Sequence, residues 1–163
     1  VVEKISPRVL VQIGIRDFCR EEYEYSDSRR KKPDDVGGGR IVTHYDRQMK
    51  KRLNAGESFD GIIKSIIKDL PPNVYVSFDI DGLDPALCPS TGTPVPGGLS
   101  FDQTASIFSA LADSGRRIVG FDLNEVAEIN EGESEWDANV GARMLFKLCG
   151  WTAITNALAE RRS

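Results

Sequence analysis

The sequence predicts an α/β fold with a mainly parallel sheet. Three short apolar segments, at 8–15, 74–81 and 118–123, have the length and the β-branched or aromatic content of buried strands. Helical patterns separate these segments and follow the last of them. Strands that alternate with helices pair in parallel, and the helices cover the sheet in layers.

The N-terminal part predicts two strands and one helix. Residues 8–15 are the first strand, residues 41–45 the second, and we expect the polar segment between them, through Arg40, to be a loop. Further on, apolar side chains recur at i, i+3, i+4, i+7, i+8 and i+11: Phe59, Ile62, Ile63, Ile66, Ile67 and Leu70. This spacing predicts an amphipathic helix, which the two following prolines end.

The C-terminal part predicts a long loop and two helices around its two strands. The loop, 82–98, is dense in Pro and Gly. Ser100 and Gln103 have the spacing of a capping box, so a helix begins there, and Gly115 is placed to end it. A last helix covers residues 140–158.

Length, charge and cysteine content exclude several classes of protein. The 163 residues suffice for one compact domain, and the net charge of −4 lacks the basic excess of nucleic-acid readers. Cys19, Cys88 and Cys149 show no CxxC spacing, which argues against a disulfide framework or a thiolate zinc site. No apolar run approaches the ~18 residues of a membrane span. We expect a cytoplasmic protein that binds neither nucleic acid nor membrane.

Two aspartates at the end of segment 74–81 form the candidate site. Successive side chains of a strand point to opposite faces, so Asp79 and Asp81 share one face at the strand's carboxyl end. Ligands of open parallel sheets bind at that edge. Two carboxylates this close can both be ionised at a low free-energy cost only when a cation lies between them. Their oxygens are suitable ligands for Mg²⁺ or Mn²⁺. The alternative for a bare pair is helix capping with solvent exposure.

A specific motif surrounds these aspartates. S-F-D-I-D-G-L-D-P at 77–85 continues into T-G-T-P at 91–94 and P-G-G at 96–98. This string resembles the block after the penultimate strand of the ureohydrolases, the arginase, agmatinase and formiminoglutamase family. It departs from the family pattern at Ser90, where the family more often has Gly.

Two further segments resemble the same family. G-F-D-L-N-E-V at 120–126 is similar to its final strand, and Q-I-G-I-R-D at 12–17 to the strand and loop that open its C-terminal half. The resemblance therefore implies a three-layer α/β/α fold of the arginase/deacetylase type that lacks its N-terminal strands. Residues 1–163 would be the C-terminal portion of a single ureohydrolase domain.

The resemblance also implies roles for individual residues. Asp79 matches the aspartate that bridges two Mn²⁺ ions, and Asp81 matches a terminal ligand of one of them. Glu125 matches the carboxylate that pairs with the guanidinium group, and Thr93 a loop hydroxyl near the substrate. Asp84 is interpreted as a loop anchor behind the metal ligands, and the alternative is that it also orients those ligands. In the implied reaction the ions activate water, which attacks the guanidino carbon and releases urea and an amine.

The remaining metal ligands of the family have no counterpart in this sequence. They come from G-G-D-H and D-A-H-x-D blocks, and neither block is present. The only histidine, His44, is interpreted as an ordinary surface or edge residue. We therefore expect the chain alone to be inactive, with the N-terminal half of the same domain as its missing partner. The family also implies a trimer or hexamer.

Two other functions stay open. V-S-F-D-I-D-G at 76–82 resembles the nucleophile motif of haloacid-dehalogenase-type phosphatases, although Leu83 stands where that motif has Thr. A non-catalytic remnant or assembly module is the third possibility. Within the ureohydrolases the substrate is arginine, agmatine, guanidinobutyrate or formiminoglutamate. The acidic residues of segment 16–22 favour a cationic tail and hence an agmatinase-like enzyme, but a solvated face explains them equally.

Overall fold

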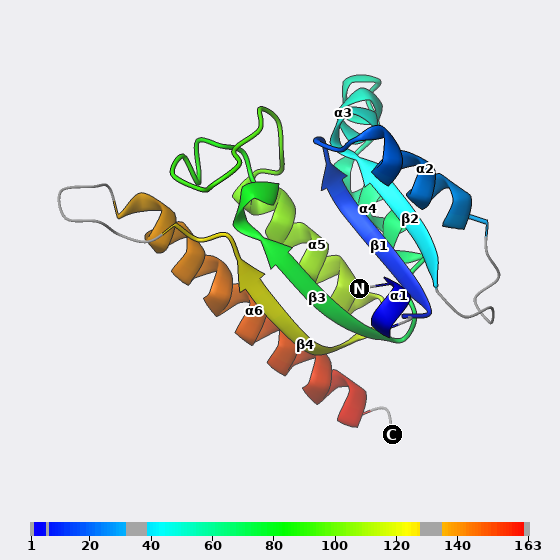
Figure 1. Cartoon of the computed structure of the whole chain (residues 1–163). Helices are drawn as coiled ribbons and strands as arrows, with labels where there is room; N and C mark the ends of the chain where they lie inside the picture. Colours follow the sequence, from blue (N-terminus) through cyan, green and yellow to red (C-terminus); the bar gives the residue numbers. More distant parts are fainter. Residues whose placement is uncertain (1, 6, 32–38, 128–134, 162–163) are drawn as a thin grey trace. The chain divides into compact units, whose positions relative to one another are not determined.

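The computed structural model describes residues 2–5, 7–31, 39–127 and 135–161 (Figure 1). The chain divides into two compact units, Val1–Pro71 and Pro72–Ser163. Each unit contains a two-stranded parallel sheet, so the predicted parallel pairing is confirmed. No helix among the described residues is long and apolar enough to span a membrane.

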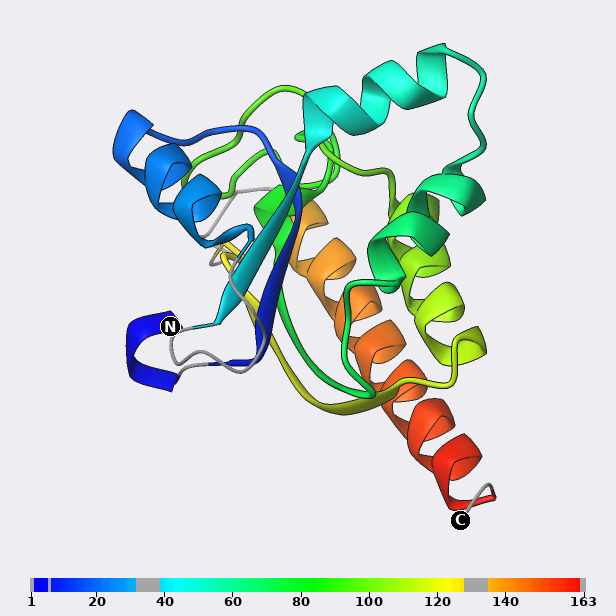
Figure 2. The same cartoon turned by 90° about the vertical axis from the view of Figure 1, so that its right-hand side faces the viewer.

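The first unit is built around strands β1 and β2. Its elements are, in order, α1 (Val2–Ile5), β1 (Val9–Ile15), α2 (Arg20–Arg29), β2 (Arg40–Tyr45), α3 (Asp46–Asn54) and α4 (Phe59–Ile67). The register runs from Val9 opposite Arg40 to Ile13 opposite His44. Within this unit α2 lies on one side of the two strands and α4 on the other (Figures 1 and 2).

Helix α2 corrects the prediction of a continuous loop between the first two strands. It has no buried residue, so the apolar periodicity that reveals most helices is absent from its sequence. Its first turn is closed locally, because the Cys19 N–H donates a 2.8 Å hydrogen bond to Glu22 Oε2. The rest of that predicted loop, at 32–38, lies outside the described residues.

Helix α4 confirms the predicted amphipathic helix. The four isoleucines on its inner face are buried: Ile62, Ile63, Ile66 and Ile67. The Ser58 hydroxyl caps the first turn by accepting a 3.1 Å hydrogen bond from the Gly61 N–H. Helix α4 ends at Ile67, three residues earlier than the apolar pattern extends.

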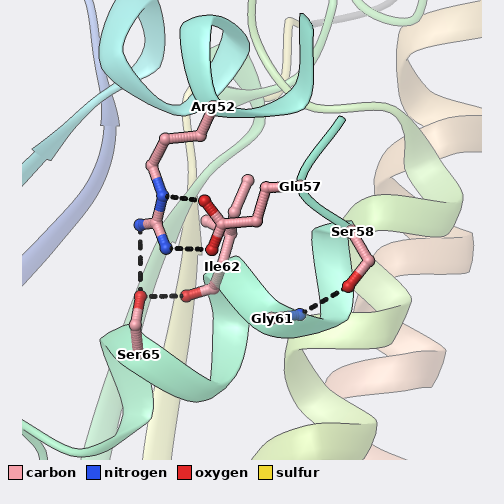
Figure 3. A network of polar contacts seen from close by, with 6 residues as sticks. All are labelled: Arg52, Glu57, Ser58, Gly61, Ile62 and Ser65. Atoms are coloured by element: carbon pink, nitrogen blue, oxygen red, sulfur yellow. Dashed lines mark hydrogen bonds and ion pairs between the residues drawn. The ribbon is translucent and has the colours of Figure 1, made fainter. Parts of the chain in front are cut away.

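An arginine ties α3 to α4 (Figure 3). Nε of Arg52 donates to Oε2 of Glu57 at 2.7 Å, and its Nη1 donates to the Ser65 hydroxyl at 3.2 Å. That hydroxyl in turn donates to the Ile62 carbonyl at 2.6 Å. The Arg52 guanidinium lowers the pKa of Glu57 through its hydrogen bonding to that carboxylate and through its positive charge. Helix α3 was not predicted, because its sequence is almost entirely polar.

The second unit carries the candidate site. Its elements are, in order, β3 (Asn73–Asp79), the 3₁₀ turn η1 (Ile80–Gly82), α5 (Phe101–Asp113), β4 (Arg117–Asn124) and α6 (Trp136–Glu160). Helices α5 and α6 lie side by side on one face of the β3–β4 sheet (Figures 1 and 2). On that face Val74 is buried, and the Phe78 ring lies 6.2 Å from the Phe108 ring.

Local signals in the second unit are confirmed. Ser100 Oγ accepts the Gln103 N–H at 3.0 Å, and Gln103 Oε1 accepts the Ser100 N–H at 2.9 Å, which is the predicted capping box. Gly115, just beyond α5, has a positive φ of 78°. The end of α6 is tied to the start of β4, because Thr155 and Asn156 hydrogen-bond the Ile118 backbone.

Candidate metal and guanidino site

The site begins where β3 and β4 end. Asp79 is the last residue of β3, and it pairs across the sheet with Asn124, the last residue of β4. The side chains of β3 alternate as predicted, with Tyr75, Ser77 and Asp79 exposed on the face opposite the helices. The predicted strand is two residues too long at this end, because the extended backbone stops at Asp79. Asp81 lies in the 3₁₀ turn η1 and is half-buried, so strand alternation does not place its side chain on the face of Asp79 as predicted. Both aspartates therefore lie at the carboxyl end of the strand.

The long loop after η1 is closed at its base. Leu83 and Leu99 form a parallel bridge, and the Asp84 N–H donates to the Leu99 carbonyl at 2.9 Å. Gly98 has a φ of 88°, and a Cβ at that position would lie 2.4 Å from the Leu83 carbonyl oxygen. Only glycine fits there. Asp84 Oδ1 accepts the Ala86 N–H at 2.9 Å, so Asp84 stabilises the turn as interpreted from the sequence.

Residues 91–93, called the TGT segment below, contact both candidate carboxylate positions. The Thr93 hydroxyl donates a 3.3 Å hydrogen bond to Asp81 Oδ2. The buried Thr91 hydroxyl donates a 2.9 Å hydrogen bond to the Glu125 carbonyl. A Cβ at Gly92 would lie 3.7 Å from Glu125 Oε2. The segment thus brings Asp81, Thr93 and Glu125 into one region of the second unit.

Glu125 has an unusual backbone. It directly follows β4, its side chain is exposed, and its φ is 62°. Among the described residues it is the only one other than glycine with a positive φ. A residue with a Cβ occupies this left-handed region only where surrounding contacts hold it, and such residues gather at functional sites.

Asp122 belongs to the same sheet face and was not identified from the sequence. Its Oδ1 accepts hydrogen bonds from the Ser77 hydroxyl at 2.7 Å and from Asn124 Nδ2 at 2.6 Å. The Ser77 bond, aided by those from Asn124 and Tyr75, holds the pKa of Asp122 below its usual value. This carboxylate is therefore ionised at neutral pH. The alternation of Asp122 and Asn124 in β4 was the available signal.

The donor chemistry of the site fits manganese, but its ligand set is incomplete. Asp79 and Asp81 offer carboxylate oxygens, which are suitable ligands for Mn²⁺. Over residues 2–5, 7–31, 39–127 and 135–161, however, no group of three or more His, Cys, Asp or Glu side chains could hold a metal ion. The two aspartates can therefore supply part of a metal centre and cannot complete one.

His44 is half-buried on β2, which pairs with β1 alone among the described strands, so it is an edge residue, one of the two interpretations drawn from the sequence. Its Nε2 is buried without a hydrogen-bond partner in the described part of the chain, and lies 4.0 Å from Asp69 Oδ2. Burial lowers the pKa of His44, although the charge of Asp69 opposes the shift. The imidazole is therefore neutral at pH 7.

The acidic segment 16–22 has a structural explanation in the first unit. Glu22 accepts the hydrogen bond that begins α2, and Glu21 is fully exposed. Hydrogen bonds to its own backbone N–H and to Cys19 lower the pKa of Glu21. Glu22 therefore contributes to helix capping, and the exposure of Glu21 is compatible with both alternatives given for this segment.

Comparison with known proteins identifies the family. A 144-residue stretch is 43% identical to an agmatinase of Enterobacter sp. (strain 638) and covers 88% of this chain and 40% of that protein. A hypothetical agmatinase from Burkholderia thailandensis superposes with a TM-score of 0.65 and 29% identity, over 93% of this chain and 41% of that chain. Proclavaminate amidino hydrolase from Streptomyces clavuligerus superposes with a TM-score of 0.63 and 27% identity, over 89% of this chain and 42% of that chain.

These likenesses confirm the arginase-type α/β fold, and the phosphatase alternative finds no support in them. The chain spans about two-fifths of the length of these relatives. The family model of the arginases, described as "Arginase family", matches residues 1–150. The chain therefore belongs to the arginase family.

Proposed function

We propose that this chain supplies the C-terminal part of a manganese-dependent ureohydrolase domain, which hydrolyses a guanidino C–N bond and is agmatinase-like. The observation that carries the proposal is the contact of the TGT segment with Asp81 on one side and Glu125 on the other. The similarity to agmatinases supports agmatine as the substrate.

Each residue of the site has a distinct task in this proposal. Asp79 and Asp81 hold the metal, and Glu125 pairs with the guanidinium group, whose planar N–H donors suit a carboxylate. Thr93 donates to Asp81 and so fixes the orientation of that carboxylate. When bound, manganese supplies Lewis-acid activation of water at neutral pH.

We also propose that an N-terminal half of the same domain completes the site, as part of a homo-oligomer. Two aspartates are too few for two ions, and the matched relatives are more than twice as long as the stretch they share with this chain. Residues 1–163 would then be one portion of a single domain, although their internal contacts divide them into two units.

A chimera tests the proposed function. In it, this chain replaces the segment of the Enterobacter agmatinase that it matches. We expect manganese-dependent urea release from agmatine by the chimera and none by the isolated chain. Asp81→Asn should abolish the activity, whereas Asp84→Asn, a matched change in the turn, should preserve it. A folded chimera that binds manganese without hydrolysing any guanidino compound would contradict the proposal.

A further inference from the structure

We infer that Thr91 is a positioning residue: its hydroxyl holds the Glu125 carbonyl and so keeps the Glu125 backbone in the conformation that aims its carboxylate. The inference rests on the proposed function, in which Glu125 binds the guanidinium group. Thr91 would not touch the substrate itself.

The need for such a residue follows from the backbone of Glu125. Its φ of 62° lies in the left-handed region, which is unfavourable for a residue with a Cβ. Hydrogen bonds to the peptide groups around that residue decide whether the conformation persists. The Thr91 hydroxyl makes its 2.9 Å hydrogen bond to the carbonyl of Glu125 itself.

Thr91 is placed rigidly enough for this task. It is only 4% exposed, and its N–H donates to the Cys88 carbonyl at 3.3 Å. The preceding residue is fixed as well, because the Ser90 N–H donates to Asp137 Oδ2 at 2.9 Å. Asp137 is 2% exposed at the start of α6. The hydroxyl is therefore anchored through the loop to the long helix of the unit.

The neighbouring glycine shows why the backbone conformation matters for the carboxylate. Glu125 Oε2 lies 3.7 Å from the position that a Cβ of Gly92 would occupy, so the carboxylate lies against the TGT segment. Rotation of Glu125 to an extended φ would turn its Cβ, and with it the carboxylate, away from this segment. Loss of the Thr91 hydrogen bond permits that rotation.

The test uses Thr91→Val, which replaces the hydroxyl with a methyl group, and Thr91→Ser, which keeps the hydroxyl. Thr104→Val is the matched control, because the Thr104 hydroxyl is buried and donates to the Ser100 carbonyl at 3.2 Å, away from Glu125. The first readout is the φ of Glu125 in the purified chain, from NMR chemical shifts and the HN–Hα coupling. The second is kcat and KM of the chimera for agmatine.

Thr91→Val should move Glu125 out of the left-handed region and raise KM about tenfold with a smaller change in kcat. Thr91→Ser and Thr104→Val should keep the positive φ and the KM of the parent. An unchanged φ and KM in Thr91→Val, or equal effects in Thr104→Val, would overturn the inference. Failure of the parent chimera to release urea would refute the proposed function, whereas the φ measurement would still decide the role of Thr91.

Discussion

Replacement of Thr155 by valine tests how α6 completes the β3–β4 sheet. Thr155 is 2% exposed, and its Oγ1 accepts the Ile118 N–H at 3.1 Å. Ile118, near the start of β4, is fully buried at 0% exposure. Valine has nearly the shape of threonine, so the substitution keeps the packing. It leaves the Ile118 N–H buried without an acceptor.

The expected loss of stability follows from that orphaned donor. A buried donor that loses its partner costs about 1–3 kcal/mol, of which the hydrogen bond itself contributes about 1 kcal/mol. We therefore expect Thr155→Val to lower the free energy of unfolding by about 2 kcal/mol. For a chain of this length each kcal/mol shifts Tm by roughly 2–4 °C, so Tm should fall by about 4–8 °C.

Urea denaturation and amide hydrogen exchange measure the two parts of this prediction. Thr155→Ser is the control, because it keeps the acceptor and loses one buried methyl group, worth about 0.8 kcal/mol. The Ile118 amide should exchange faster in Thr155→Val and stay protected in Thr155→Ser. The reasoning fails if Thr155→Val keeps the Ile118 amide protected and costs less than about 0.5 kcal/mol.

Three further predictions concern single sites. The imidazole of His44, the only histidine, should titrate in the NMR spectrum with a pKa below the usual value of about 6.5. Because the unfolded chain then binds the proton at a higher pH than the folded chain, the free energy of unfolding should decrease as the pH falls below that value. A pKa at or above the usual value would contradict the effect of burial. Ser77→Ala should raise the pKa of Asp122, read from its carboxyl ¹³C shift, and no change would show that Ser77 is not the main cause. Gly98→Ala should lower the free energy of unfolding, measured by denaturation, by several kcal/mol. Gly56→Ala is the control and should lower it by about 1 kcal/mol, because Gly56 also has a positive φ but nothing lies within 4 Å of its added Cβ. Equal losses of stability in the two variants would contradict the steric argument.

The fold was predictable wherever the burial of one face of a helix or strand produces a periodic pattern of apolar residues in the sequence. The alternation in β3 and the isoleucine spacing of α4 each arise because one face of the element is buried, and both predictions are confirmed. Helix α2 buries no residue, so no pattern reports it. Helix α3 buries only Asp46 and Met49, too few for a recognisable stripe.

The candidate site was predictable only in part, for a similar reason. Asp79 and Asp81 were identified from their place at the carboxyl end of a predicted strand and from the family motif. Thr93 and Glu125 were identified from the family resemblance alone, and the roles of all four stay predictions. Thr91 lies in the same motif, but its contact with Glu125 depends on how residues 34 positions apart meet in space. No local spacing encodes such a contact.

The manganese content of the chimera tests most directly whether Asp79 and Asp81 supply the C-terminal share of a two-metal centre. After dialysis against Mn²⁺ and removal of free metal, elemental analysis should give two ions per chimeric chain. The double variant Asp79→Asn/Asp81→Asn should retain fewer than one, and the isolated chain should retain none. Two ions held by the double variant, or by the isolated chain with release of urea, would contradict this assignment.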